Sequence, residues 1–178
     1  MDRQQIIYKD LGIVDYKTAW DYQEELVHQN REIKQSMVNG QWSMINSLQT
    51  PNSQLQITNY KLQTTNYLLF CEHPSVYTLG KSGSMKNVLL SEKEMEEKEI
   101  EFFKTNRGGD ITFHGLQQVV GYPILDLENF YTDIGRYLRD LEDVIIKTIA
   151  EYGLKGEGSK GETGVWIQPG VIGKERKI

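Results

Sequence analysis

Cysteine is almost absent from this 178-residue chain, which contains only one, Cys71. A single thiol cannot close an internal disulfide, so the chain is not a small secreted scaffold held together by disulfides. The three histidines are scattered and show no HExxH or CxxC spacing, which counts against a bound metal ion. We therefore expect neither a disulfide framework nor a metal site.

Long apolar runs and an excess of positive charge are also missing. A membrane-spanning helix needs about eighteen consecutive apolar residues, and no stretch of this sequence is that long. The first residues, MDRQQIIYKDLG, lack the apolar core and cleavage site of a signal peptide. The net charge is −5 and the pI is near 5.3, whereas a nucleic-acid surface needs clustered lysine and arginine. These absences predict a soluble, cytoplasmic protein that binds neither nucleic acid nor membrane.

The remaining composition suits one globular domain over residues 1–178, because a hydrophobic content of 38% supports a real core in a chain too short for two ordinary domains. Apolar residues recur with a helical period from Asp15 to about Met37 and again from Thr132 to Ile149. Gly153 then stands where the end of a helix favours a left-handed residue. We expect an amphipathic helix in each of these two segments.

Shorter signals fill the rest of the chain. Ser91, with Glu94 three residues later, forms a capping-box pattern that begins a short charged helix. Segments rich in β-forming residues occupy 67–73, 75–80, 118–127 and 163–170. This order of elements predicts an α/β (α+β) fold with a mixed sheet. Residues 39–66 are rich in Gln, Asn, Ser and Thr, and we interpret them as a polar insertion.

A glycine-rich stretch, RGGDITFHG, begins at Arg107. Two adjacent glycines let a ligand approach the backbone closely, and an arginine supplies a permanent planar charge. Thr112 and His114 are two residues apart, so they share one face of an extended segment. This pattern could form the wall of a narrow slot for a thin ligand, or it could be an ordinary turn with a structural histidine. It matches neither phosphate-binding glycine motif, so we do not expect it to cradle phosphate.

Several segments together resemble the lipoyl(octanoyl) transferases, a family that shares its fold with the catalytic domains of biotin and lipoate protein ligases. The matching segments are, in chain order, DLGIVDYKTAWDYQEEL, EHPSVYTLGK, RGGDITFHG, QVVGYPILDL and TGVW with RKI. The resemblance covers almost the whole chain outside 39–66. It implies a mixed sheet backed by helices, with a tunnel for an acyl chain.

The activity implied by the resemblance is octanoyl transfer from octanoyl-acyl carrier protein to a lysine of lipoyl domains. The acceptors would be the lipoyl domains of 2-oxoacid dehydrogenases and the glycine cleavage H protein, and no cofactor would be needed. Each buried CH₂ contributes roughly 0.8 kcal/mol, so an octanoyl chain suits a slender tunnel with apolar walls. The strand around 118–127 is a candidate for one wall.

The resemblance also implies roles for individual residues. The catalytic lysine would be Lys177, which would stabilise a cysteine thiolate that carries the acyl group as a thioester. The acyl site would be lined by Arg107, Gly108, Gly109, Asp110, Ile111, Thr112, Phe113 and His114.

The chain departs from the family pattern in two respects. The family's nucleophilic cysteine follows the lysine, and no cysteine follows Lys177 here. We therefore expect a domain that is incomplete at its C-terminus and inactive by itself. Cys71 is expected to be a buried structural residue, because it occupies an apolar strand position and cysteine is among the most buried residue types. Leu116 and Gln117 replace a common Pro-Gly pair, which predicts a different loop path.

Two other functions remain open from the sequence. One is an ATP-dependent lipoate or biotin protein ligase of the same fold, which adenylation activity would reveal. The other is a non-catalytic module that holds an acyl carrier protein or an acyl group without turning it over.

Overall fold

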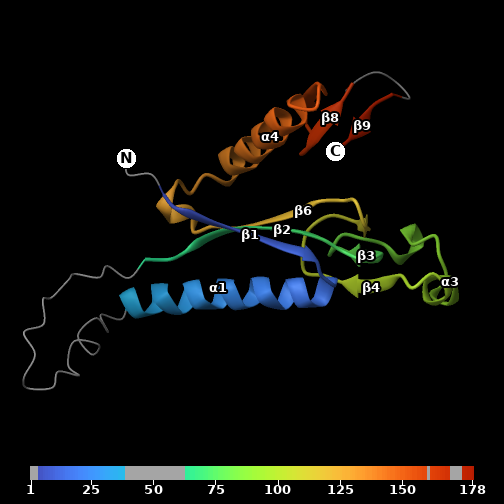
Figure 1. Cartoon of the computed structure of the whole chain (residues 1–178), viewed down its shortest axis with the longest axis horizontal. Helices are drawn as coiled ribbons and strands as arrows, with labels where there is room; N and C mark the ends of the chain where they lie inside the picture. The colour runs from blue at the N-terminus through green and yellow to red at the C-terminus, as the bar shows by residue number, and fades with distance from the viewer. Residues whose placement is uncertain (1–3, 39–62, 160, 169–173) are drawn as a thin grey trace, which may run out of the picture. The chain divides into compact units, whose positions relative to one another are not determined.

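The computed structural model describes residues 4–38, 63–159, 161–168 and 174–178 (Figure 1). The chain forms two compact units, Met1–Asn129 and Phe130–Ile178. The expectation of a single domain over residues 1–178 stays a prediction. In the described part of the chain, no helix is long and apolar enough to cross a membrane.

The first unit contains a mixed three-stranded sheet at its centre. Its strands are β1 (Ile6–Ile13), β2 (Asn66–Glu72) and β6 (Val120–Ile124), in the order β1-β2-β6. Strand β1 runs parallel to β2, and β6 runs antiparallel to it. The predicted mixed α/β fold is confirmed.

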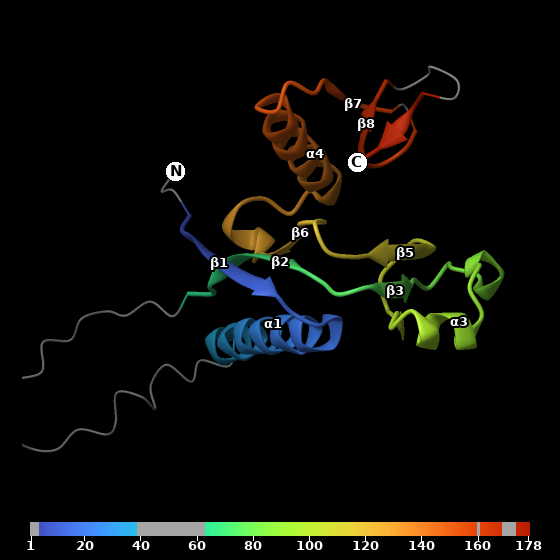
Figure 2. The ribbon, with the colours of Figure 1, turned by 45° about the vertical axis from the view of Figure 1, so that its right-hand side comes forward.

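Helix α1 (Tyr16–Val38) lies along one face of this sheet, as Figure 2 shows. Its apolar stripe buries Leu26 against Leu69 of β2 and Ile124 of β6, which together form the core of the unit. The helix predicted from apolar spacing is confirmed. Asp15 precedes the helix, and its carboxylate accepts a hydrogen bond from the Thr18 N–H at 2.8 Å, as a capping side chain does.

A second three-stranded sheet has the order β4-β3-β5. Strand β3 (Val76–Leu79) pairs in parallel with β4 (Glu101–Lys104) and antiparallel with β5 (Ile111–His114). A short helix, α3 (Glu92–Glu97), precedes β4, and Ser91 caps it with the predicted capping box. Two 3₁₀ turns, η1 (Met85–Asn87) and η2 (Leu127–Asn129), complete the unit.

The predicted polar insertion, 39–66, lies mostly outside the described residues. Its last residues belong to the folded unit, because Thr64 and Asn66 are buried. The Thr64 hydroxyl donates to the Asp126 carboxylate at 2.6 Å, and Asn66 begins strand β2. These contacts anchor the start of β2 to the end of β6.

The described residues of the second unit form one helix and a small antiparallel sheet. Helix α4 (Ile134–Ala150) is the predicted second amphipathic helix, and Gly153 follows it with a positive φ of 75°, as expected. The sheet has the order β7-β8-β9, with β7 at Gly156–Gly158, β8 at Val165–Ile167 and β9 at Arg176–Lys177. Of these strands only β8 was expected from residue patterns, because it consists of the β-forming residues Val-Trp-Ile, whereas β7 is Gly-Glu-Gly and β9 is Arg-Lys.

Candidate active site

Arg107 folds back onto the strands of its own sheet. Its Nη2 atom lies 2.8 Å from three acceptors, the carbonyl and hydroxyl oxygens of Thr78 and the hydroxyl of Thr112. Thr78 has an exposed fraction of 0%, and its hydroxyl oxygen accepts a hydrogen bond from the guanidinium. The arginine is therefore held in one orientation, and it connects β3, β5 and the loop between β4 and β5.

The adjacent glycines have a packing role. A Cβ atom on Gly80 would lie 2.4 Å from the Gly109 carbonyl oxygen and 2.8 Å from that of Gly108. The backbone after β3 therefore touches the backbone of the glycine pair directly. Gly109 also has a positive φ of 86°, a conformation that side chains other than glycine rarely adopt.

Asp110 fixes the turn that follows β3. Its carboxylate accepts hydrogen bonds from the Ser84 backbone N–H at 3.1 Å and from the Asn87 side-chain amide. Its carbonyl oxygen accepts the Gly80 N–H at 3.0 Å. Asp110 thus shapes the loops around Arg107.

Along β5 the side chains alternate as predicted. Thr112 pairs in register with Thr78 and His114 with Val76, so Thr112 and His114 share a face. Phe113 is on the other face, where it packs against Tyr77 with ring centroids 5.2 Å apart and remains 45% exposed. Of the stretch 111–114, only Thr112 and His114 therefore lie on the side that holds Arg107.

His73 is the centre of a cluster of aromatic rings. Its exposed fraction is 0%, its Nδ1 atom lies 2.8 Å from the Val14 carbonyl oxygen, and its Nε2 atom lies 2.8 Å from the Tyr122 hydroxyl. The Tyr16 ring packs 5.4 Å from the His73 ring, and the His114 ring lies 5.9 Å from it. Burial lowers the pKa of His114, and the nearby His73 and Arg107 lower it further. His114 is therefore a neutral imidazole at neutral pH.

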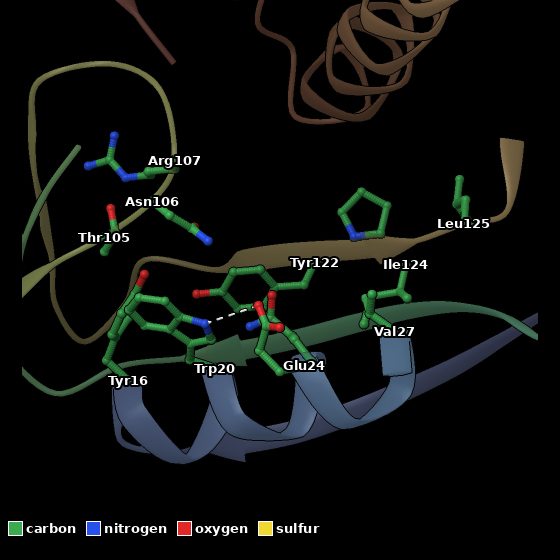
Figure 3. A pocket seen from close by; sticks show the side chains of 12 residues that line it. Tyr16, Trp20, Glu24, Val27, Thr105, Asn106, Arg107, Tyr122, Ile124 and Leu125 are labelled. Atoms are coloured by element: carbon green, nitrogen blue, oxygen red, sulfur yellow. Dashed lines mark hydrogen bonds between the residues drawn. The ribbon is translucent and has the colours of Figure 1, made fainter. Parts of the chain in front are cut away.

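A cavity of about 400 Å³ opens beside this cluster (Figure 3). Helix α1 forms one wall and strand β6 with its continuation forms the opposite wall, as the labelled side chains show. The loop after β4 closes one end. The lining residues are Tyr16, Trp20, Gln23, Glu24, Val27, Thr105, Asn106, Arg107, Tyr122, Pro123, Ile124 and Leu125.

The cavity contains one of the eight residues predicted for the acyl site, Arg107. The strand expected to supply an apolar wall does line it, through Tyr122 and Ile124 among others. Sequence reasoning did not identify Tyr16 and Trp20 of α1 as site residues. Their spacing of four was visible, but it was indistinguishable from an ordinary apolar stripe facing the core.

Lys177 lies in the second unit, on β9, directly across from Trp166 of β8. Its Nζ atom is 5.5 Å from the centre of the Trp166 ring, within the range of a cation–π contact. A Cβ atom on Gly164 would lie 2.6 Å from the Lys177 Cε atom. The Gly164 N–H donates to the Glu142 carboxylate at 2.6 Å, which fixes the glycine under the lysine chain.

Replacing Gly164 with alanine is expected to displace the Lys177 side chain. The glycine has a φ of 116°, so alanine adds backbone strain of about 1–3 kcal/mol as well as the clash with Cε. We expect an altered rate of Lys177 acetylation by an amine-reactive reagent, measured by peptide mass spectrometry. Gly158→Ala is the control, because nothing lies within 4 Å of its added Cβ atom. Equal labelling of Lys177 in both variants would contradict this arrangement.

The loop after His114 explains the departure at Leu116 and Gln117. Gln117 has a φ of 68°, the left-handed conformation that glycine adopts without cost. Its backbone N–H donates to the Glu72 carboxylate at 2.6 Å. The glutamine therefore keeps a glycine-like backbone, held by an acceptor from β2.

A Gln117→Gly variant is expected to gain up to about 1 kcal/mol of stability. Relief of the left-handed strain, about 1–2 kcal/mol, exceeds the about 0.4–1 kcal/mol of extra entropy that glycine gives the unfolded chain. Urea unfolding followed by circular dichroism measures this change. Gln118→Gly is the comparison, because Gln118 is not among the residues with positive φ, and it should lose stability. A loss in both variants would contradict the interpretation.

Cys71 has the properties expected of a structural residue. It is 3% exposed, and its Sγ atom lies 3.5 Å from His73 Nε2. Burial, reinforced by the nearby Asp10 carboxylate, raises the pKa of the thiol, so it stays protonated at neutral pH. Among the described residues, no group of three or more His, Cys, Asp or Glu side chains could hold a metal ion.

Comparisons with known proteins identify the family and the fold of this chain. The sequence profile described as "Lipoyl protein ligase A/B catalytic domain" matches residues 15–178, and the chain belongs to that family. A chain of a bi-partite lipoate protein ligase system from the archaeon Thermoplasma acidophilum covers 99% of this chain with a TM-score of 0.55 and 16% identity, and the match spans 55% of that chain. At this identity the likeness shows the fold, and it confirms the predicted lipoate-ligase architecture.

Curated relatives at higher identity are named octanoyltransferase. The protein of Flavobacterium psychrophilum is 54% identical over 92% of this chain, and that of Christiangramia forsetii is 48% identical over 94%. A third, from Flavobacterium johnsoniae, is 52% identical over 94%. The matches cover 62%, 64% and 65% of those proteins, so the chain spans less than two thirds of their length.

Proposed function

We propose that this chain forms the acyl-binding part of an octanoyltransferase of lipoate biosynthesis. The observation that carries the proposal is the cavity between α1 and β6, which lies beside the loop that leads from β4 into the glycine-rich stretch. Its volume of about 400 Å³ falls within the roughly 300–1,000 Å³ typical of small-molecule sites. The octanoyltransferase name of the curated relatives supports the same reaction.

In this proposal the acyl chain lies along the apolar wall formed by Val27 and Ile124. Arg107 closes one end of the cavity, and its position is fixed by Thr78 and Thr112. The stretch Arg107–His114 then acts chiefly as the frame of the site, with the backbone of Gly108 and Gly109 shaping the loop that carries the arginine. An acyl chain of this kind gains roughly 0.8 kcal/mol per buried CH₂.

The chemical step needs a nucleophile and a base. We infer that Lys177 takes the proton of the attacking thiol and then, as an ammonium, stabilises the thiolate, and that this thiol is not that of Cys71. Cys71 does not fit this role, because its thiol is buried and its pKa is raised. The donor would be octanoyl-acyl carrier protein, and the acceptor would be the lysine of a lipoyl domain in a 2-oxoacid dehydrogenase or in the glycine cleavage H protein.

The test uses the protein expressed from its native gene, octanoyl-acyl carrier protein and an unmodified lipoyl domain, followed by intact-mass analysis of the domain. Octanoylation without ATP supports the proposal. Modification that requires ATP together with free octanoate or lipoate would instead identify a ligase. Binding of the octanoyl carrier without any transfer would identify the non-catalytic acyl-binding module.

A further inference from the structure

A buried hydrogen-bond chain lies behind one wall of the cavity and ends at the Tyr122 hydroxyl. It runs from the Val14 carbonyl oxygen to His73 Nδ1, and from His73 Nε2 to Tyr122, with both distances at 2.8 Å. Tyr122 is itself a lining residue of the cavity. The direction of its O–H bond therefore determines what the tyrosine offers to a ligand.

The Val14 carbonyl and the Tyr122 hydroxyl determine where the hydrogens lie in this series of hydrogen bonds. A carbonyl oxygen can only accept, so His73 Nδ1 carries the hydrogen. In the neutral imidazole Nε2 is then an acceptor, and the Tyr122 O–H donates to it. Tyr122 keeps this proton because burial, with smaller effects of Cys71 and Tyr16, raises the pKa of its hydroxyl by more than the Gln23 side chain lowers it. The Cys71 thiol, 3.5 Å from the same nitrogen, is a weaker donor.

We propose that His73 is a positioning residue that turns the Tyr122 O–H bond away from the cavity, so that the Tyr122 oxygen selects acyl donors that bring an N–H. The oxygen meets a ligand only as a hydrogen-bond acceptor. An amide in the thiol arm of an acyl thioester is a donor of the required kind. The inference rests on the proposed function, because it takes the cavity as the site of the acyl donor.

Two small acyl donors that differ at one atom test this selectivity. The first is the octanoyl thioester of N-acetylcysteamine, whose thiol arm carries an amide N–H. The second is the octanoyl thioester of 2-acetoxyethanethiol, in which an ester oxygen replaces that N–H. We expect the first to bind about five- to tenfold more tightly by calorimetry, the value of one net hydrogen bond. Neither probe contains a lysine, so the difference reports on the donor and not on the acceptor domain.

Two variants test whether the selectivity arises from Tyr122 and His73. In Tyr122→Phe the ratio of the two affinities should fall to about one. In His73→Phe it should fall as well, because the freed Tyr122 O–H can rotate and donate to the ester oxygen. Tyr77→Phe is the matched control, since Tyr77 packs against Phe113 and is not a lining residue of the cavity, and its ratio should equal that of the unmodified protein.

The outcomes distinguish a failure of this inference from a failure of the proposed function. Equal binding of both donors to the unmodified protein overturns the role of His73 and Tyr122 and leaves the acyl site standing. Binding of neither donor overturns both proposals. If His73→Phe does not fold, the unmodified protein and Tyr122→Phe still decide the question, because a purely structural tyrosine would leave the affinity ratio unchanged.

Discussion

Gly80→Ala is expected to destabilise the first unit by about 3 kcal/mol. The added Cβ atom would lie 2.4 Å from the Gly109 carbonyl oxygen and 2.8 Å from the Gly108 carbonyl oxygen. Overpacking typically costs about 1–3 kcal/mol, and the upper end applies here because backbone atoms cannot rotate away from the clash. The loop that carries Arg107 must move to make room, so octanoyl-thioester binding should also weaken.

The measurement is urea unfolding followed by circular dichroism, with calorimetry of the thioester on the same samples. Gly108→Ala is the matched control in the same loop, because its added Cβ atom would meet nothing within 4 Å and its φ is not positive. It should be neutral, or should stabilise the unit by up to about 1 kcal/mol through the unfolded state. If Gly80→Ala behaves like this control, the backbone contact between the two loops is not what requires glycine at position 80.

Local patterns in the sequence were enough to find several elements of the fold. The period of the apolar residues predicted α1 and α4, the capping box at Ser91 predicted α3, and the spacing of Thr112 and His114 predicted their common face. Each of these signals depends on neighbours within a few residues. Such neighbours are adjacent in any fold that contains the element.

Contacts between distant segments were not predictable in the same way. The glycine pair was interpreted as access for a ligand, whereas Gly109 closely approaches Gly80, a residue about thirty positions earlier in the chain. His73 meets Tyr122 only because β2 and β6 pair antiparallel in one register. Register between strands depends on the whole hydrophobic pattern and on the connections, so no local signal fixes which side chains will meet.

Arg107→Ala is expected to lower the stability of the first unit by about 3 kcal/mol. It leaves the buried Thr78 hydroxyl without its guanidinium donor, and it removes the contacts to the Thr78 carbonyl and the Thr112 hydroxyl. A buried polar group that loses its partner costs about 1–3 kcal/mol, and bonds to a charged group are the stronger kind. Arg107→Lys should recover only part of the loss, since a single ammonium does not present the planar fork of a guanidinium. Lys93→Ala is the charge-matched control, because Lys93 is exposed and pairs with Glu97 of the same helix, α3. It should change stability by less than about 0.5 kcal/mol.

A double-mutant cycle decides whether the loss arises at Thr78. Thr78→Val removes the buried hydroxyl while keeping the shape of the side chain, so the Arg107→Ala variant should cost less in that background. We expect a coupling of at least about 1 kcal/mol between the two positions, the amount typical of residues in one hydrogen-bond network. Additive effects would mean that the arginine stabilises the unit through contacts other than the one to the Thr78 hydroxyl, such as those to the Thr78 carbonyl and the Thr112 hydroxyl. Coupling would show that Arg107 is first a clamp between β3 and β5, and that its place at the end of the cavity follows from that clamp.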